Sequence, residues 1–143
     1  MKEQSFKSHA KYVPLFHGSA LFILLGIVGA VVNFIHAYNA ASGRLIAALL
    51  LLLFIIAGLF FWFIRSFALG AQDRAIRAEE NLRYFALTGK VFDTKLKLGQ
   101  IIALRFAPNE EFVALTDRAV NENLTPVNIK QAIQNWRPDY YRI

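Results

Sequence analysis

The sequence of 143 residues contains no cysteine, and histidine occurs at only three positions. Without cysteine there is no disulfide, no thiol nucleophile and no zinc site with sulfur ligands. The sequence also lacks the nucleophile motif G-x-S-x-G and the phosphate-binding motifs G-x-x-x-x-G-K-[ST] and G-x-G-x-x-G. Because these signatures of catalysis are missing, we expect a protein that is not an enzyme.

Charged residues are absent from two long apolar stretches, 15–37 and 45–64. Each is long enough to cross a hydrocarbon core of about 30 Å at about 1.5 Å per helical residue. A chain in lipid must satisfy its own backbone hydrogen bonds, which favours helices. The first stretch is too long for a cleaved signal peptide and has no small-residue cleavage site. The sequence therefore predicts two transmembrane helices at about 15–37 and 45–64.

The link between the two stretches, YNAASGR, is so short that the helices must form an antiparallel hairpin. Its only cation is Arg44, whereas seven basic residues flank the outer ends of the hairpin: Lys2, Lys7, Lys11, Arg65, Arg74, Arg77 and Arg83. By the positive-inside rule, both termini are predicted to be cytoplasmic. This divides the chain into a cytoplasmic N-terminal segment (1–14), a transmembrane hairpin (15–64) and a cytoplasmic helical domain (65–143).

Small residues gather on one face of the first transmembrane helix. Gly26, Ala30 and Asn33 are spaced by four and three residues, and Ala57 and Gly58 offer a matching gap in the second helix. Small residues let helices approach closely, and an asparagine amide can form a hydrogen bond across the contact. One interpretation is packing within the hairpin. The other is a subunit interface, or a pore lined by Asn33.

The second helix is predicted to continue beyond the membrane as far as Thr88, where Gly89 supplies a C-terminal cap. Apolar residues along this extension alternate at spacings of four and three, which is typical of a coiled-coil seam. The seam consists of Ile64, Ala68, Ala71, Ala75, Ala78, Leu82 and Phe85. Either the seam packs on its own domain or it associates with a second copy.

The remainder of the chain predicts a small helical bundle. We expect a buried helix over 98–107, a second that starts at Pro108, and a third that runs from Pro126 to Trp136 behind Thr125 as its N-cap. The extension of the second helix beyond the membrane, which we call the stalk, carries acids one turn from arginines. Asp73–Arg77 and Glu79–Arg83 are the pairs expected on its solvated side.

The histidines do not form a ligand set. His17 and His36 lie about 28 Å apart along one helix, and His9 could meet His17 only if the segment at Pro14 folded back. A zinc site needs about four ligands, so we predict neither metal nor cofactor, and keep His17 as a candidate polar site. Lys7, Lys11, Arg65 and Arg74 are candidates for contact with lipid headgroups. No basic helix or groove predicts binding to nucleic acid.

Three stretches, FKSHAKYVPLFH, LGQIIALRFAPNEEFVAL and IKQAIQNWRPDYYRI, resemble a family of small bacterial membrane proteins with two membrane helices. The resemblance covers nearly the whole chain, and the domain that defines the family has no known function. It implies a bacterial origin and an inner-membrane location. It implies no activity, cofactor or site residue.

The sequence thus predicts an all-α membrane protein, with a two-helix transmembrane hairpin, a cytoplasmic helical extension and a small helical bundle. The function that fits these features is a self-associating scaffold or accessory subunit. The alternative is an oligomeric channel or transport component. Expected partners are the lipid bilayer, further copies of the chain, and another membrane or cytoplasmic protein.

Overall fold

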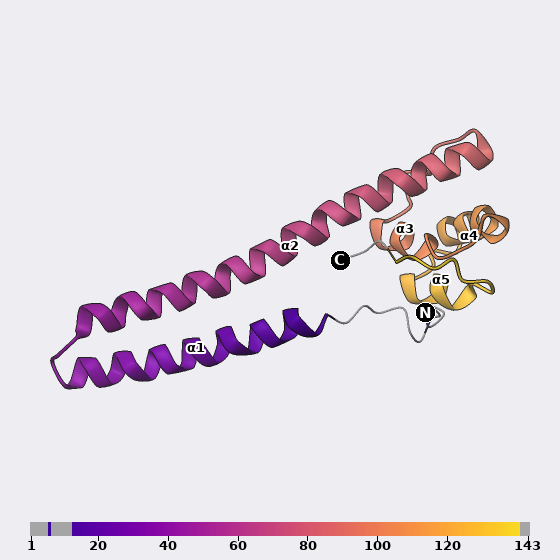
Figure 1. The fold of residues 1–143 in the computed structure, drawn as a ribbon. Helices are drawn as coiled ribbons and strands as arrows, with labels where there is room; N and C mark the ends of the chain where they lie inside the picture. Colours follow the sequence, from indigo (N-terminus) through magenta and orange to yellow (C-terminus); the bar gives the residue numbers. More distant parts are fainter. Residues whose placement is uncertain (1–5, 7–12, 141–143) are drawn as a thin grey trace. The chain divides into compact units, whose positions relative to one another are not determined.

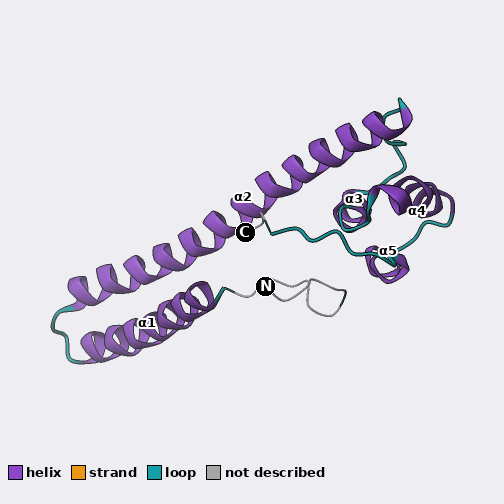
Figure 2. Ribbon diagram, turned by 45° about the vertical axis from the view of Figure 1, so that its right-hand side comes forward, coloured by secondary structure: helices purple, strands orange, loops and turns teal. Residues whose placement is uncertain are grey.

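A computed structural model describes residue 6 and residues 13–140 of the chain. These residues form five helices and no strand (Figures 1 and 2). The helices are α1 (Pro14–Asn39), α2 (Arg44–Thr88), α3 (Leu98–Leu104), α4 (Asn109–Asn121) and α5 (Pro126–Ala132). The prediction of an all-α fold is therefore confirmed.

The chain divides into two compact units. The hairpin unit holds α1 and the part of α2 that ends at Ala68, and the C-terminal unit holds the rest of α2 together with α3, α4 and α5. In the hairpin unit, α1 and α2 run antiparallel (Figures 1 and 2). Both helices are long and apolar enough to cross a membrane.

A tight loop joins α1 to α2. Gly43 adopts a left-handed backbone with φ of 67°, a conformation that glycine reaches without steric cost. Arg44 then closes the loop, because its Nε and Nη2 atoms donate hydrogen bonds to the Tyr38 carbonyl oxygen over 3.2 and 2.9 Å. Its guanidinium also lies 4.9 Å from the centre of the Tyr38 ring. The only cation of the loop thus neutralises the carbonyl end of α1.

Large apolar side chains form the core of the C-terminal unit. Phe106, Phe112, Leu104 and Ile129 are fully buried. Gln100 is the polar residue at their edge, and it is only 3% exposed. Its Oε1 accepts from the Lys97 amide over 2.7 Å, and its Nε2 donates to the Ala119 and Leu124 carbonyl oxygens over 3.1 and 2.9 Å. One amide therefore ties α3 to the end of α4 and to the loop that follows.

Three helix boundaries differ from the prediction. α3 ends at Leu104 instead of 107, and α4 begins at Asn109 with Pro108 as its N-cap residue. The largest error concerns α5, which was predicted to reach Trp136 but ends at Ala132.

The early end of α5 has a clear cause in Glu111. Its carboxylate accepts hydrogen bonds from the Gln134 amide over 2.9 Å and from the backbone and side-chain amides of Asn135 over 2.9 and 3.0 Å. These bonds hold Gln134 and Asn135 in a bend outside the helix. Trp136 still packs inward, with its ring centre 4.8 Å from that of Phe106.

Candidate functional site

Four of the small residues predicted to pack or self-associate lie against the partner helix of the hairpin. A Cβ atom on Gly26 would overlap the ring of Phe54, and one on Gly58 would touch Ile27 at 3.5 Å. Ala30 is 2% exposed and Ala57 is half-buried. The structure therefore uses these residues for close packing within one chain.

Asn33 is placed differently from the prediction that grouped it with Gly26 and Ala30. Its side chain is exposed, and no hydrogen bond within the described part of the chain involves its amide. Each helical residue advances by about 100°, so Asn33 lies only about 20° from Gly26 but about 60° from Ala30, at the edge of the face that contacts α2. Gly29 lies one turn earlier on the same outer side, and a Cβ there would meet nothing within 4 Å. Gly29 and Asn33 therefore form an open face of α1.

Aromatic and basic side chains meet at the end of the hairpin where the chain enters α1. Phe16 stacks on Phe61 with ring centres 4.4 Å apart, and the Arg65 guanidinium lies 5.2 Å from the centre of the Phe16 ring. His17 Nδ1 donates to the Val13 carbonyl oxygen over 2.8 Å. The His17 side chain thus forms a hydrogen bond within the first turn of α1, and the Arg65 guanidinium lies beside the aromatic pair Phe16 and Phe61. Such residues are characteristic of a membrane boundary.

Two of the predicted headgroup contacts, Lys7 and Lys11, lie outside the described residues, as does His9. Arg74 belongs to the C-terminal unit and its side chain is exposed. No group of three or more His, Cys, Asp or Glu residues that could hold a metal occurs in the described residues.

The alanine seam of α2 does not pack on its own domain in the C-terminal unit. Ala71, Ala75 and Ala78 are exposed, and Leu82 and Phe85 are 68% and 51% exposed. The face of α2 that turns toward the rest of the unit is the opposite one, where Ile76 and Glu80 are 7% and 6% exposed and Arg83 lies against Phe112 of α4. Ala71, Ala78, Leu82 and Phe85 are therefore not covered by their own unit, whereas Ala75 also lines a cavity beside Arg105. We call the set Ala71, Ala75, Ala78, Leu82 and Phe85 the α2 seam.

The buried face of α2 carries an ion cluster centred on Glu80. Its carboxylate lies 3.0 Å from Arg83 Nη1 and 3.7 Å from Arg137 Nη1. Arg83 also donates to the Ala107 carbonyl oxygen over 2.8 Å, and its guanidinium lies 4.1 Å from the centre of the Phe112 ring. Burial lowers the pKa of Arg83, although the Glu80 carboxylate opposes this shift.

The expected surface pairs of α2 are not formed. Arg83 turns inward to Glu80 instead of outward to Glu79, because the Ala107 carbonyl oxygen and the Phe112 ring complete its surroundings there. Asp73 and Arg77 also form no ion pair within the described part of the chain. Glu79 and Arg74 are both exposed and are not engaged in ion pairs with described residues.

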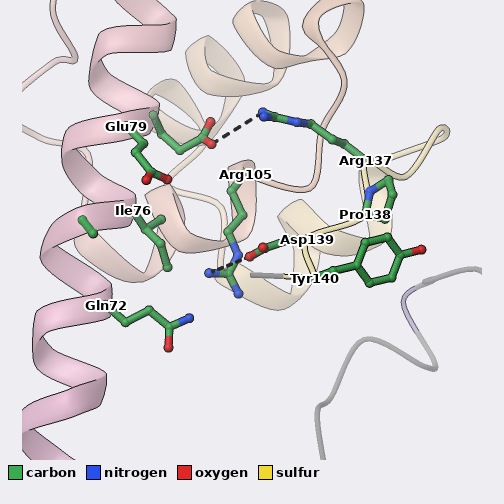
Figure 3. A pocket seen from close by; sticks show the side chains of 10 residues that line it. Gln72, Ile76, Glu79, Arg105, Arg137, Pro138, Asp139 and Tyr140 are labelled. Atoms are coloured by element: carbon green, nitrogen blue, oxygen red, sulfur yellow. Dashed lines mark ion pairs between the residues drawn. The ribbon is translucent and has the colours of Figure 1, made fainter. Parts of the chain in front are cut away.

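A cavity of about 460 Å³ lies beside this cluster (Figure 3). Figure 3 shows Gln72 and Glu79 along the α2 wall, with Arg105 and Asp139 opposite. Arg105 Nη1 lies 3.3 Å from Asp139 Oδ2, and Glu80 and Arg137 form the second pair at the rim. These charges compensate one another within the unit and brace the C-terminal stretch against α2 and α3.

A family model described as a family of unknown function (DUF6526) matches residues 1–143. The chain belongs to this family. The expected membership of a family of unknown function is thereby confirmed, and because the DUF6526 family has no known function, membership assigns no activity, substrate or site residue. No curated protein and no solved structure matches the chain.

Proposed function

We propose that this protein is an integral protein of the bacterial inner membrane that self-associates and presents its C-terminal unit on the cytoplasmic side. It serves there as a scaffold or accessory subunit for another membrane or cytoplasmic protein. The proposal assigns it no catalytic step and no cofactor. It rests on the two apolar helices, on the distribution of cations and on one polar group in the first span.

That group is the Asn33 amide, which carries the proposal. Asn33 lies within the apolar stretch 15–37, about one turn from its loop end; its side chain is exposed at the edge of the helix contact, and no described residue forms a hydrogen bond with it. Lipid chains offer the amide no partner either, and an unpaired polar group in an apolar medium is costly. An asparagine side chain is both donor and acceptor, so the Asn33 of a second copy satisfies it. Gly29, one turn away, allows the two helices to approach closely.

The orientation follows from the cations at the two ends of the hairpin. Arg44 at the loop is bound to the Tyr38 carbonyl oxygen, whereas Arg65 and the basic residues of the stalk lie beyond the other end. An excess of Lys and Arg marks the cytoplasmic side. This distribution supports cytoplasmic termini and a cytoplasmic C-terminal unit.

Mass determination in native lipid tests self-association directly. We expect a dimer or a larger oligomer for the natural sequence. Asn33→Leu is expected to weaken association about fivefold, because a hydrogen bond between membrane helices contributes on the order of 1 kcal/mol. Ile35→Leu is the matched control, since Ile35 is 53% exposed on another side of α1 and its replacement keeps the surface apolar. A strict monomer at every concentration contradicts the proposal.

An oligomeric channel is the second candidate, and the same amide favours it. If several copies turn Asn33 toward a shared axis, the amides line a polar path through an otherwise uncharged span. Conductance in planar bilayers measures this activity. A channel is supported by currents that Asn33→Leu abolishes, and it is contradicted by assembled protein that conducts no ions.

A further inference from the structure

We propose that the α2 seam docks against the same seam of a second copy, forming a short parallel two-stranded coiled coil next to the membrane. The inference rests on the proposed function, because insertion in one membrane gives both copies the same orientation. It adds a second interface, with a defined register, to the one proposed around Asn33.

The shape of the seam fits a close helix pair. Its residues are spaced by four, three, four and three, which places Ala75 and Leu82 at a positions and Ala71, Ala78 and Phe85 at d positions of a heptad. The alanines allow the two backbones to approach near the membrane end. Leu82 and Phe85, exposed to water at 68% and 51% in the single chain, supply the larger apolar surface farther along.

Charge complementarity identifies the occupant as a second copy in parallel. In this heptad Arg74 occupies a g position and Glu79 the e position five residues later. In a parallel dimer, e and g residues of opposite helices flank the seam and form interhelical salt bridges. Arg74 of each copy therefore faces Glu79 of the other, which gives two symmetry-related pairs. Both side chains are exposed and form no ion pair with described residues of their own chain.

The buried face of α2 supports the same assignment. Ile76 and Glu80 hold α2 on the C-terminal unit from the side opposite the seam. The helices α3, α4 and α5 leave Ala71, Ala78, Leu82 and Phe85 uncovered, and Ala75 and Glu79 stay exposed at the edge of the cavity beside Arg105. Docking requires no rearrangement of the core around Phe106 and Phe112.

Disulfide cross-linking tests the register, and the natural sequence has no cysteine that would interfere. The full chain in phospholipid vesicles is oxidised with a single cysteine at Ala71, Leu82 or Arg77. Disulfides form when the Cα atoms are about 6 Å apart, so Ala71→Cys and Leu82→Cys are both expected to give dimers. Only a parallel pair brings both positions onto their own counterparts. Arg77 is exposed but off the seam, and Arg77→Cys is expected to cross-link about tenfold less.

Charge exchange tests the ion pairs. Arg74→Glu and Glu79→Arg each replace two attractive contacts with repulsive ones, and each is expected to lower the cross-linked fraction about 3- to 10-fold at low salt. The double variant Arg74→Glu/Glu79→Arg restores opposite charges and is expected to recover the yield of the natural pair. Recovery separates a direct pair from a general loss of folding.

The two proposals fail in different ways. An oligomer that is weakened by Asn33→Leu but gives no cross-link at Ala71→Cys and Leu82→Cys overturns the coiled coil and leaves self-association through the hairpin intact. Cross-linking at one of the two positions only, or a double variant without recovery, overturns the parallel register. A strict monomer in lipid overturns both proposals.

Discussion

The most buried residues of the hairpin unit are small, whereas the C-terminal unit buries large apolar residues as well as alanines. Ala30 and Ala47 are 2% exposed in the hairpin, and Leu15 and Phe22 on its surface are 85% and 74% exposed. In the C-terminal unit Phe112 is fully buried. Water drives large apolar side chains inward, but lipid is as apolar as leucine, so helices in lipid meet through small residues that pack closely. The difference indicates that the two units are built for two solvents.

The largest effect is expected from the same substitution made once in each unit. Phe112→Ala should lower the free energy of unfolding of the C-terminal unit by about 4 kcal/mol, because it leaves a cavity in the core and removes the ring beside Arg83. Phe22→Ala should change the free energy of unfolding of the hairpin unit by less than about 0.5 kcal/mol.

Urea denaturation of the full chain in lipid, followed by tryptophan fluorescence, measures each variant in its own unit. Trp136 packs on Phe106 in the C-terminal unit, so Phe112→Ala is followed in a Trp62→Phe background; Trp62 lies in the hairpin, so Phe22→Ala is followed in a Trp136→Phe background. Equal losses for the two variants would show that the units do not differ in the way that their burial indicates.

Replacement of a side-chain amide by leucine should also affect the folding of the two units differently. Gln100→Leu should destabilise the C-terminal unit by about 3 kcal/mol, because the Lys97 amide and the Ala119 and Leu124 carbonyl oxygens lose their partner. Asn33→Leu should leave the folding of the hairpin intact and affect only association. The same denaturation assay, together with circular dichroism of Asn33→Leu in lipid, checks this contrast. A stable Gln100→Leu variant would mean that the three bonds do not hold the unit together.

A glycine pair tests the packing within the hairpin. Gly26→Leu should disfavour the closed hairpin by about 2 kcal/mol, because the side chain collides with Phe54. Gly29→Leu should leave it closed, since Gly29 faces open space. Spin labels at Leu15→Cys and Ile64→Cys, both exposed positions, report the separation of the helices by pulsed electron paramagnetic resonance. An unchanged separation in Gly26→Leu would contradict the contact with Phe54.

The smallest effect is a pH dependence confined to the C-terminal unit. Burial raises the pKa of the Glu111 carboxyl, but hydrogen bonds from Gln134 and Asn135 outweigh it, and the pKa is lower than in an ordinary glutamate. The charged form therefore stabilises the fold above the unfolded-state pKa of about 4.3, and this contribution is lost as the pH falls through the depressed folded-state value.

Glu111→Gln should accordingly cost about 1 kcal/mol at pH 7 and progressively less as the pH falls below about 4. Urea denaturation across this range compares the variant with the natural sequence. A difference that stays constant with pH would show that the carboxylate charge does not contribute.

The sequence alone indicates the hairpin because its evidence is local. Length and the absence of charge define both spans, and Pro14 begins α1 as predicted. The small residues Gly26 and Gly58 follow helical spacing, so the sequence also predicts that each packs against the partner helix. The end of α5 cannot be predicted in this way, because it depends on Glu111, which lies more than twenty residues earlier in the chain.

The outward faces were harder to predict than the helices. Spacing alone grouped Asn33 with Gly26, yet a few tens of degrees of rotation separate a residue inside the hairpin from one outside it. Likewise, the choice of Arg83 between Glu79 and Glu80 depends on Phe112 and Ala107, which only the folded unit brings near. Gly29, four residues before Asn33, was the available signal for the open face.

Accessibility of single cysteines in intact cells is the most direct test of the central claim, a membrane hairpin with both ends in the cytoplasm. Ser42→Cys lies in the loop between α1 and α2, and Lys90→Cys lies in the C-terminal unit after α2. A membrane-impermeant maleimide should label Ser42→Cys from outside the inner membrane, and should label Lys90→Cys only after that membrane is opened. Labelling of Lys90→Cys in intact cells, or protection of Ser42→Cys, would contradict the account.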